Sequence, residues 1–184
     1  MVSQSIRNTV WQDYLDVDRL GRYYEALADR YQWYYRSVRF LLLVMVIVSV
    51  AFPYTSLPQP ISWIVGAMLV ILTAILVAVD YVGDFSKKSA VLHGISIQVK
   101  RLELEWEALW LEIDDANAED SEIRRRNSEC QLRLIEATAR SGEEGITINS
   151  KLNQKCMETA YAIMEDRYRH AYGEEPATSP SLST

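Results

Sequence analysis

The sequence contains few of the residues that carry most enzyme and metal chemistry. It has two histidines, His93 and His170, and two cysteines, Cys130 and Cys156. None of them lies in a CxxC or HExxH pattern, and neither a GxSxG motif nor a Gly-rich phosphate loop is present. We therefore expect no enzymatic activity, catalytic residue, metal site or cofactor. We expect the cysteines to be free thiols in a reducing compartment.

The alternation of apolar and polar residues that marks β-strands is also missing. Apolar residues recur instead at steps of three and four, which is the period of an amphipathic helix. The fold class that this pattern predicts is all-α.

Charge is absent from Phe40 to Val79, where no Asp, Glu, Lys, Arg or His occurs. Core helices of soluble bundles rarely lack charge over such a length, although two buried helices remain the alternative. Three prolines divide the block into two spans, at about 34–53 and 61–80, joined by a loop at 53–60. We therefore predict a membrane protein with a two-transmembrane helical hairpin.

Basic residues flank this hairpin on both sides, while the connecting loop has no charge. Arg36 and Arg39 precede the first span, and Lys87 and Lys88 follow the second. The positive-inside rule therefore places both termini in the cytoplasm. The predicted organisation is a cytoplasmic amphipathic helix at 1–37, the hairpin at 38–79, a cytoplasmic helical region at 80–172 and a disordered tail at 173–184.

The N-terminal helix has a tyrosine-rich face. The face includes Tyr23, Tyr24, Tyr31, Tyr34 and Tyr35, and the helix is expected to run unbroken into the first span. Such a face either packs against the chain itself or docks a partner or a membrane surface.

A heptad seam follows the second span and predicts a coiled-coil-like helical bundle. The seam comprises Leu92, Ile95, Val99, Leu102, Trp106, Leu109 and Ile113. Ile97, Leu104 and Leu111 repeat every seven residues on the opposite side, so this helix has two apolar faces. The seam is our candidate oligomer interface, and the alternative is a central position within a bundle of one chain.

The region from 80 to 184 carries 13 basic and 20 acidic residues, which argues against generic binding to nucleic acid. Its concentrated positive charge lies in Arg124, Arg125, Arg126 and Arg133, which are candidates for binding a phosphate-bearing ligand. The alternative is a solvated helix face paired with neighbouring glutamates.

Small and polar residues share one face of the second span if the helix turns by about 100° per residue. They are Ser62, Gly66, Thr73, Asp80 and Asp84, and two leucines, Leu69 and Leu76, interrupt the face. Polar groups in membranes usually face a bundle interior or a water-filled cavity, so this face is a candidate pore lining with an acidic cytoplasmic mouth. The alternative is that the small residues serve close packing between helices and that Asp80 only marks the membrane boundary.

Four features together resemble the SLATT family of two-transmembrane effector domains in bacterial conflict systems. They are the segment ArgTyrGlnTrpTyrTyrArgSerValArg at 30–39, the proline-rich hairpin loop, AspTyrValGlyAspPhe at 80–85, and the long Trp-bearing helix that follows. The resemblance covers about residues 10 to 172. It implies a pore-forming effector in the bacterial inner membrane, with no catalytic residues.

The resemblance also implies partners. They are membrane lipid, further copies of the chain, with a tetramer favoured, and a nucleotidyltransferase whose nucleotide or short oligonucleotide product controls the effector. The leading hypothesis is therefore a ligand-gated ion channel of an antiphage system. Two alternatives are a phage holin-like permeabilising protein and a non-conducting membrane anchor with a docking helix.

We predict that the full-length protein sediments with membranes and enters solution only with detergent, because its charge-free block needs lipid as a solvent. Ultracentrifugation of lysed cells, with and without detergent, measures this. Recovery in the detergent-free supernatant would contradict the membrane assignment.

Overall fold

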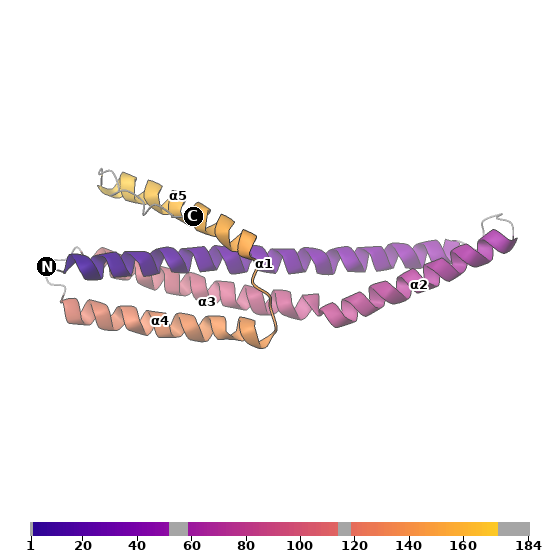
Figure 1. Cartoon of the computed structure of the whole chain (residues 1–184), viewed down its shortest axis with the longest axis horizontal. Helices are drawn as coiled ribbons and strands as arrows, with labels where there is room; N and C mark the ends of the chain where they lie inside the picture. The colour runs from indigo at the N-terminus through magenta and orange to yellow at the C-terminus, as the bar shows by residue number, and fades with distance from the viewer. Residues whose placement is uncertain (1, 52–58, 114–118, 173–184) are drawn as a thin grey trace. The chain divides into compact units, whose positions relative to one another are not determined.

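The structure is a computed structural model that describes residues 2–51, 59–113 and 119–172 (Figure 1). These residues form the helices α1 (Gln4–Ala51), α2 (Gln59–Gly83), α3 (Phe85–Glu112), α4 (Asp120–Glu143) and α5 (Ser150–Tyr172). No strand occurs in the three ranges, which confirms the all-α prediction. Most of the predicted hairpin loop and the predicted disordered tail lie outside the described residues.

Contacts divide the chain into two compact units. The bundle unit comprises Met1–Ala26 with Leu92–Thr184, and the hairpin unit comprises Leu27–Val91. The hairpin unit extends beyond the charge-free block because its flanks also pack together. The ring of Phe85 lies 6.2 Å from that of Tyr31, and the Ser89 hydroxyl donates a hydrogen bond to the Ala28 carbonyl at 3.2 Å.

Helix α1 is one continuous helix of 48 residues that contributes to both units. It contains no proline, and the first proline of the chain is Pro53. The prediction that the N-terminal helix runs unbroken into the first apolar segment is therefore confirmed. Tyr23 and Tyr24 pack within the bundle unit, where both are buried and the Tyr23 hydroxyl accepts a hydrogen bond from the Asn149 backbone N–H at 2.9 Å. Tyr31 and Tyr35 are half-buried in the hairpin unit, and Tyr34 is 46% exposed.

The heptad seam of α3 is buried within a single chain. All seven seam residues are at most 5% exposed, and Trp106 is fully covered. A side chain without exposed surface cannot contact a second copy, so the structure moves the candidate oligomer interface away from Leu92, Ile95, Val99, Leu102, Trp106, Leu109 and Ile113. The opposite face of α3 is exposed, at 43% for Ile97, 65% for Leu104 and 64% for Leu111.

A buried polar network joins α1, α3 and α4. The Trp106 indole donates a hydrogen bond of 2.7 Å to the Asn127 carbonyl oxygen, and the Asn127 amide donates one of 2.6 Å to Asp13. The Gln131 amide donates a further bond of 2.8 Å to the same Asp13 oxygen. Because buried polar atoms are costly without partners, this network fixes the register of the three helices.

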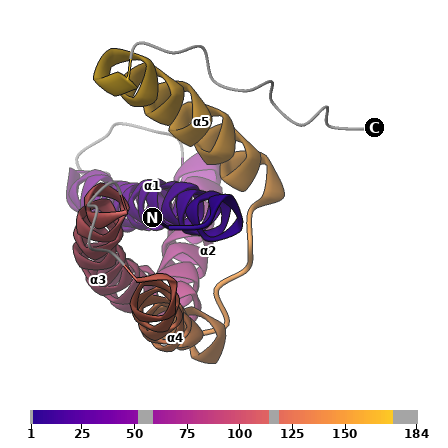
Figure 2. The ribbon, with the colours of Figure 1, turned by 90° about the vertical axis from the view of Figure 1, so that its left-hand side faces the viewer.

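Helix α5 packs on α1 through one apolar face. Cys156, Ala160 and Met164 on this face are buried. The helix begins after Asn149, whose side-chain oxygen accepts a hydrogen bond from the Leu152 N–H at 3.0 Å. In the bundle unit, Figure 2 looks along the N-terminal part of α1 and shows α5 on one side of it and α3 with α4 on another.

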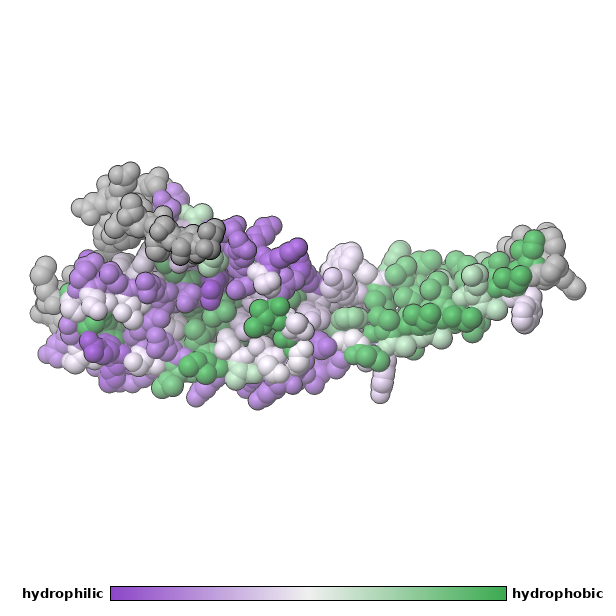
Figure 3. Space-filling model, in the orientation of Figure 1, coloured by the Kyte–Doolittle hydropathy of each residue, from purple (hydrophilic) through white to green (hydrophobic). Residues whose placement is uncertain are grey.

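The hairpin unit exposes most of the large hydrophobic side chains that the protein leaves uncovered (Figure 3). Phe40 is 66% exposed, Met68 is 67% exposed and Val70 is 70% exposed. Two helical stretches, one near each side of the hairpin loop, are long and apolar enough to cross a membrane, and neither is buried by other parts of the chain.

We predict that Asn127→Ala lowers the free energy of unfolding by about 1–3 kcal/mol, because it leaves the buried Trp106 N–H without an acceptor. Urea unfolding in detergent, followed by circular dichroism, measures the change. Asn8→Ala is the matched control, since Asn8 is exposed and is hydrogen-bonded to Gln4 on the helix surface. An equal effect of the two substitutions would show that the network does not stabilise the bundle.

Candidate functional site

The predicted pore-lining face of α2 is the half-buried face of that helix. Ser62, Gly66, Leu69, Thr73 and Asp80 all have intermediate exposure, while most residues between them are exposed. The Thr73 hydroxyl donates a hydrogen bond of 2.8 Å to the Leu69 carbonyl of its own helix. The helix itself therefore satisfies this polar group, without a partner from elsewhere.

Helix α1 carries a matching half-buried face in the same unit. Its members recur at steps of four and three and are Tyr31, Tyr35, Val38, Leu42 and Met45. Because the hairpin unit consists of the second part of α1, α2 and the start of α3, these two faces cover each other. In one chain, the small residues of α2 thus allow close packing of the hairpin, and only part of the candidate pore lining stays accessible.

The structure corrects the prediction for Asp84. The sequence argument assumed a helix continuing through this residue, but α2 ends at Gly83 and Asp84 has φ = 43°. A residue in this left-handed conformation interrupts the turn of 100° per residue, so Asp84 does not extend the face that ends at Asp80. Asp80 is half-buried and Asp84 is exposed, and neither has an ion pair with a described residue.

The junction between α2 and α3 is a single residue with a defined packing arrangement. Phe85, the first residue of α3, packs its ring 6.2 Å from that of Tyr31 and 6.0 Å from that of Tyr34. A side chain at Gly83 would overlap the Phe85 ring, so glycine is required there for close approach. Sequence reasoning missed this role, although the sequence AspTyrValGlyAspPhe contained the signal.

Three of the four candidate ligand-binding arginines are paired with glutamates. Arg125 bonds Glu122 and Glu129 along α4, as the alternative reading of the sequence expected. Two further ion pairs cross from α4 to α3, Arg133 with Glu105 at 2.8 Å and Arg126 with Glu112. The fourth arginine, Arg124, is exposed and has no ion pair with a described residue.

Ion pairs with glutamates therefore neutralise most of the positive charge of these four arginines in the absence of a ligand. The hydrogen bond between Arg125 and Glu122 lowers the pKa of that carboxyl and raises the pKa of the guanidinium. A phosphate group competing for Arg125 would have to displace an existing carboxylate, whereas Arg124 offers an uncommitted guanidinium.

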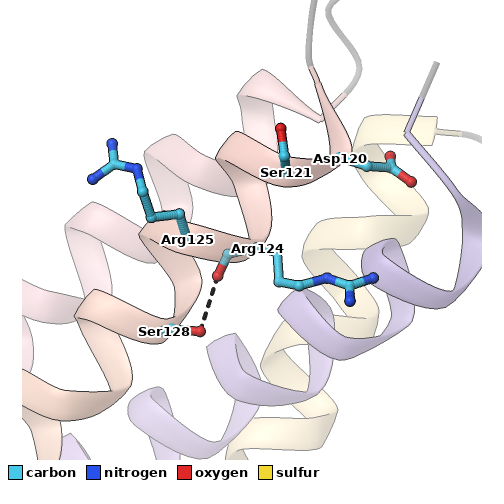
Figure 4. A pocket seen from close by; sticks show the side chains of 5 residues that line it. All are labelled: Asp120, Ser121, Arg124, Arg125 and Ser128. Carbon is cyan, nitrogen blue, oxygen red and sulfur yellow. Dashed lines mark hydrogen bonds between the residues drawn. The ribbon is translucent and has the colours of Figure 1, made fainter.

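The four arginines line two separate hollows of the bundle unit. A pocket of about 200 Å³ between α3 and α4 includes Arg126 and Arg133 together with Glu105 and Glu129. A more open hollow of about 590 Å³ is lined by Asp120, Ser121, Arg124, Arg125 and Ser128. Figure 4 shows that the side chains of Arg124 and Arg125 leave α4 in different directions, so the two guanidinium groups do not converge on one point.

Both cysteines are free thiols, as the sequence predicted, and the structure shows that both are buried. Burial raises the pKa of the Cys130 and Cys156 thiols above the ordinary value, so both are protonated near neutral pH. Among the described residues, no group of three or more His, Cys, Asp or Glu side chains is arranged to hold a metal ion.

We predict opposite effects of two Gly→Ala substitutions. Gly83→Ala displaces the Phe85 ring and lowers stability by about 1–3 kcal/mol. Gly94→Ala, at an open helical position with no atom near the added methyl group, raises stability by up to about 1 kcal/mol. Thermal unfolding in detergent measures both, and a Gly83→Ala protein as stable as the wild type would contradict the described junction.

No protein-family model, curated protein or solved structure matches this chain. The resemblance to the SLATT family therefore stays a prediction.

Proposed function

We propose that the protein is an effector of a bacterial antiphage system whose copies form an ion-conducting pore in the inner membrane. The observation that carries the proposal is the face of α2 that bears Ser62, Gly66 and Thr73 and leads to Asp80, on a helix whose other faces are apolar and exposed. Polar groups on a membrane helix are stable where they face water or protein, and several copies around one axis provide such a site.

Packing of this face against α1 corresponds to a closed state of the pore. Opening requires α2 to turn its small and polar residues away from α1 and toward the common axis. The one-residue break at Asp84 separates α2 from α3, so altered dihedral angles at this junction can change the direction of α2 relative to the start of α3. Both termini lie in the cytoplasm in this arrangement, with Asp80 at the cytoplasmic end of the pore.

Control by a ligand is the second part of the proposal. A nucleotide or short oligonucleotide, made by a partner nucleotidyltransferase, binds near Arg124 in the open hollow of the bundle unit. The ligand shifts the equilibrium between closed and open states by binding one of them more tightly, and a few kcal/mol of differential affinity suffices.

A non-conducting membrane anchor is the second candidate function. Two observations favour it: the small-residue face of α2 is already covered by α1, and Ile97, Leu104 and Leu111 form an exposed apolar face on α3. A cytoplasmic partner docked on that face would be held at the membrane without any ion pathway.

We predict that Asp80→Asn reduces the cation preference of the pore roughly fivefold, which corresponds to about 1 kcal/mol of lost attraction. Ion flux and reversal potentials of the full-length protein in liposomes measure this preference.

Glu136→Gln is the matched control for this experiment. It removes the same charge from an exposed position on α4 and should leave the preference unchanged. An unchanged preference in the aspartate variant would exclude the acidic mouth. Liposomes that stay ion-tight with every variant and ligand would favour the anchor.

A further inference from the structure

One stripe of α1 joins an exposed cation to an exposed apolar ridge. Trp33, Arg36, Phe40, Leu43 and Ile47 follow each other at steps of three and four, so they share one face of the helix. The apolar members are strongly exposed, for example Trp33 at 65% and Ile47 at 58%. From Arg36 to Ile47 the helix rises about 16 Å, close to the thickness of one leaflet of a hydrocarbon core of about 30 Å.

A second guanidinium is held beside this stripe. Arg39 lies over the Tyr35 ring, with its central carbon 4.4 Å from the ring centroid. Arg36 and Arg39 are exposed and have no ion pair with a described residue. Two arginines one turn apart, one of them restrained by a ring, are suited to bidentate binding of a phosphodiester.

The flanks of the hairpin are basic although the whole chain is acidic. Residues 27–39 and 80–91 carry five basic side chains, Arg30, Arg36, Arg39, Lys87 and Lys88, against three acidic ones, Asp29, Asp80 and Asp84. The contacts of Phe85 with Tyr31 and Tyr34, and of Ser89 with Ala28, bring these two flanks to the same end of the hairpin. This end therefore attracts anions.

We infer that the stripe on α1 is a binding site for an anionic glycerophospholipid. Its phosphate is bound by Arg36 and Arg39, and an acyl chain lies along Phe40, Leu43 and Ile47. The apolar ridge distinguishes a lipid from a soluble phosphate, and the positive flanks distinguish an anionic headgroup from a zwitterionic one. The inference rests on the membrane insertion of the proposed function and does not depend on conduction.

Lipid enrichment tests the site. The full-length protein is reconstituted into vesicles of equal parts phosphatidylglycerol and phosphatidylcholine and then extracted with mild detergent. The ratio of the two lipids retained is measured by native mass spectrometry. We expect severalfold enrichment of phosphatidylglycerol for the wild type, and the bulk ratio for Arg36→Gln/Arg39→Gln.

Two further variants make the result specific. Arg101→Gln/Arg140→Gln removes the same charge from exposed positions of the bundle unit and should keep full enrichment. Arg36→Lys/Arg39→Lys keeps the charge, guards against a folding defect in the glutamine variant, and should keep part of the enrichment.

Three outcomes would overturn the site: enrichment retained by Arg36→Gln/Arg39→Gln, equal loss in the bundle-unit control, or complete displacement of the lipid by excess inorganic phosphate. The assay reads lipid binding alone. Enrichment without ion flux would therefore contradict the channel and support the lipid site. Ion flux without enrichment would support the channel and contradict the lipid site.

Discussion

The rest of this structure depends on one constraint, which is that the exposed apolar side chains of the hairpin need a non-aqueous solvent. Removing each large apolar side chain from water is worth about 1.5–3 kcal/mol, and most of the exposed ones in this protein lie between Trp33 and Val82. Moving all of them from water into lipid would therefore gain more than the 5–15 kcal/mol by which a domain is typically stable. Lipid is the solvent that removes this penalty. The basic and aromatic residues at the open end of the hairpin suit the boundary between that lipid and water.

The bundle unit differs from the hairpin unit because it buries its apolar side chains in a core formed by a few helices. It uses the heptad seam of α3 for this purpose and adds a polar network centred on Asn127 and Asp13. The seam is then unavailable to other molecules. What α3 offers outside is the second apolar face, Ile97, Leu104 and Leu111, so assembly of copies or docking of a partner involves a surface separate from the core.

The junction between α2 and α3 lies within the hairpin unit, which extends to Val91. A helix that ran straight through Asp84 would extend the face of α2 that ends at Asp80 into the start of α3. The left-handed conformation of Asp84 interrupts this face, and the Phe85 ring packs next to Gly83 and two tyrosines of α1. Such a junction is stable in one arrangement and still confines any change of direction to a few dihedral angles.

The sequence by itself determined the helices, the apolar hairpin and the existence of two apolar faces on α3. These features follow from local composition and from periodicity, which each segment carries independently of its neighbours. Only the tertiary structure decided which face of α3 is internal, that Arg126 and Arg133 pair with glutamates of α3, and that the candidate pore lining packs on α1. Each of these outcomes depends on which side chains the fold brings together from distant positions, and periodicity within one helix contains no information about that choice.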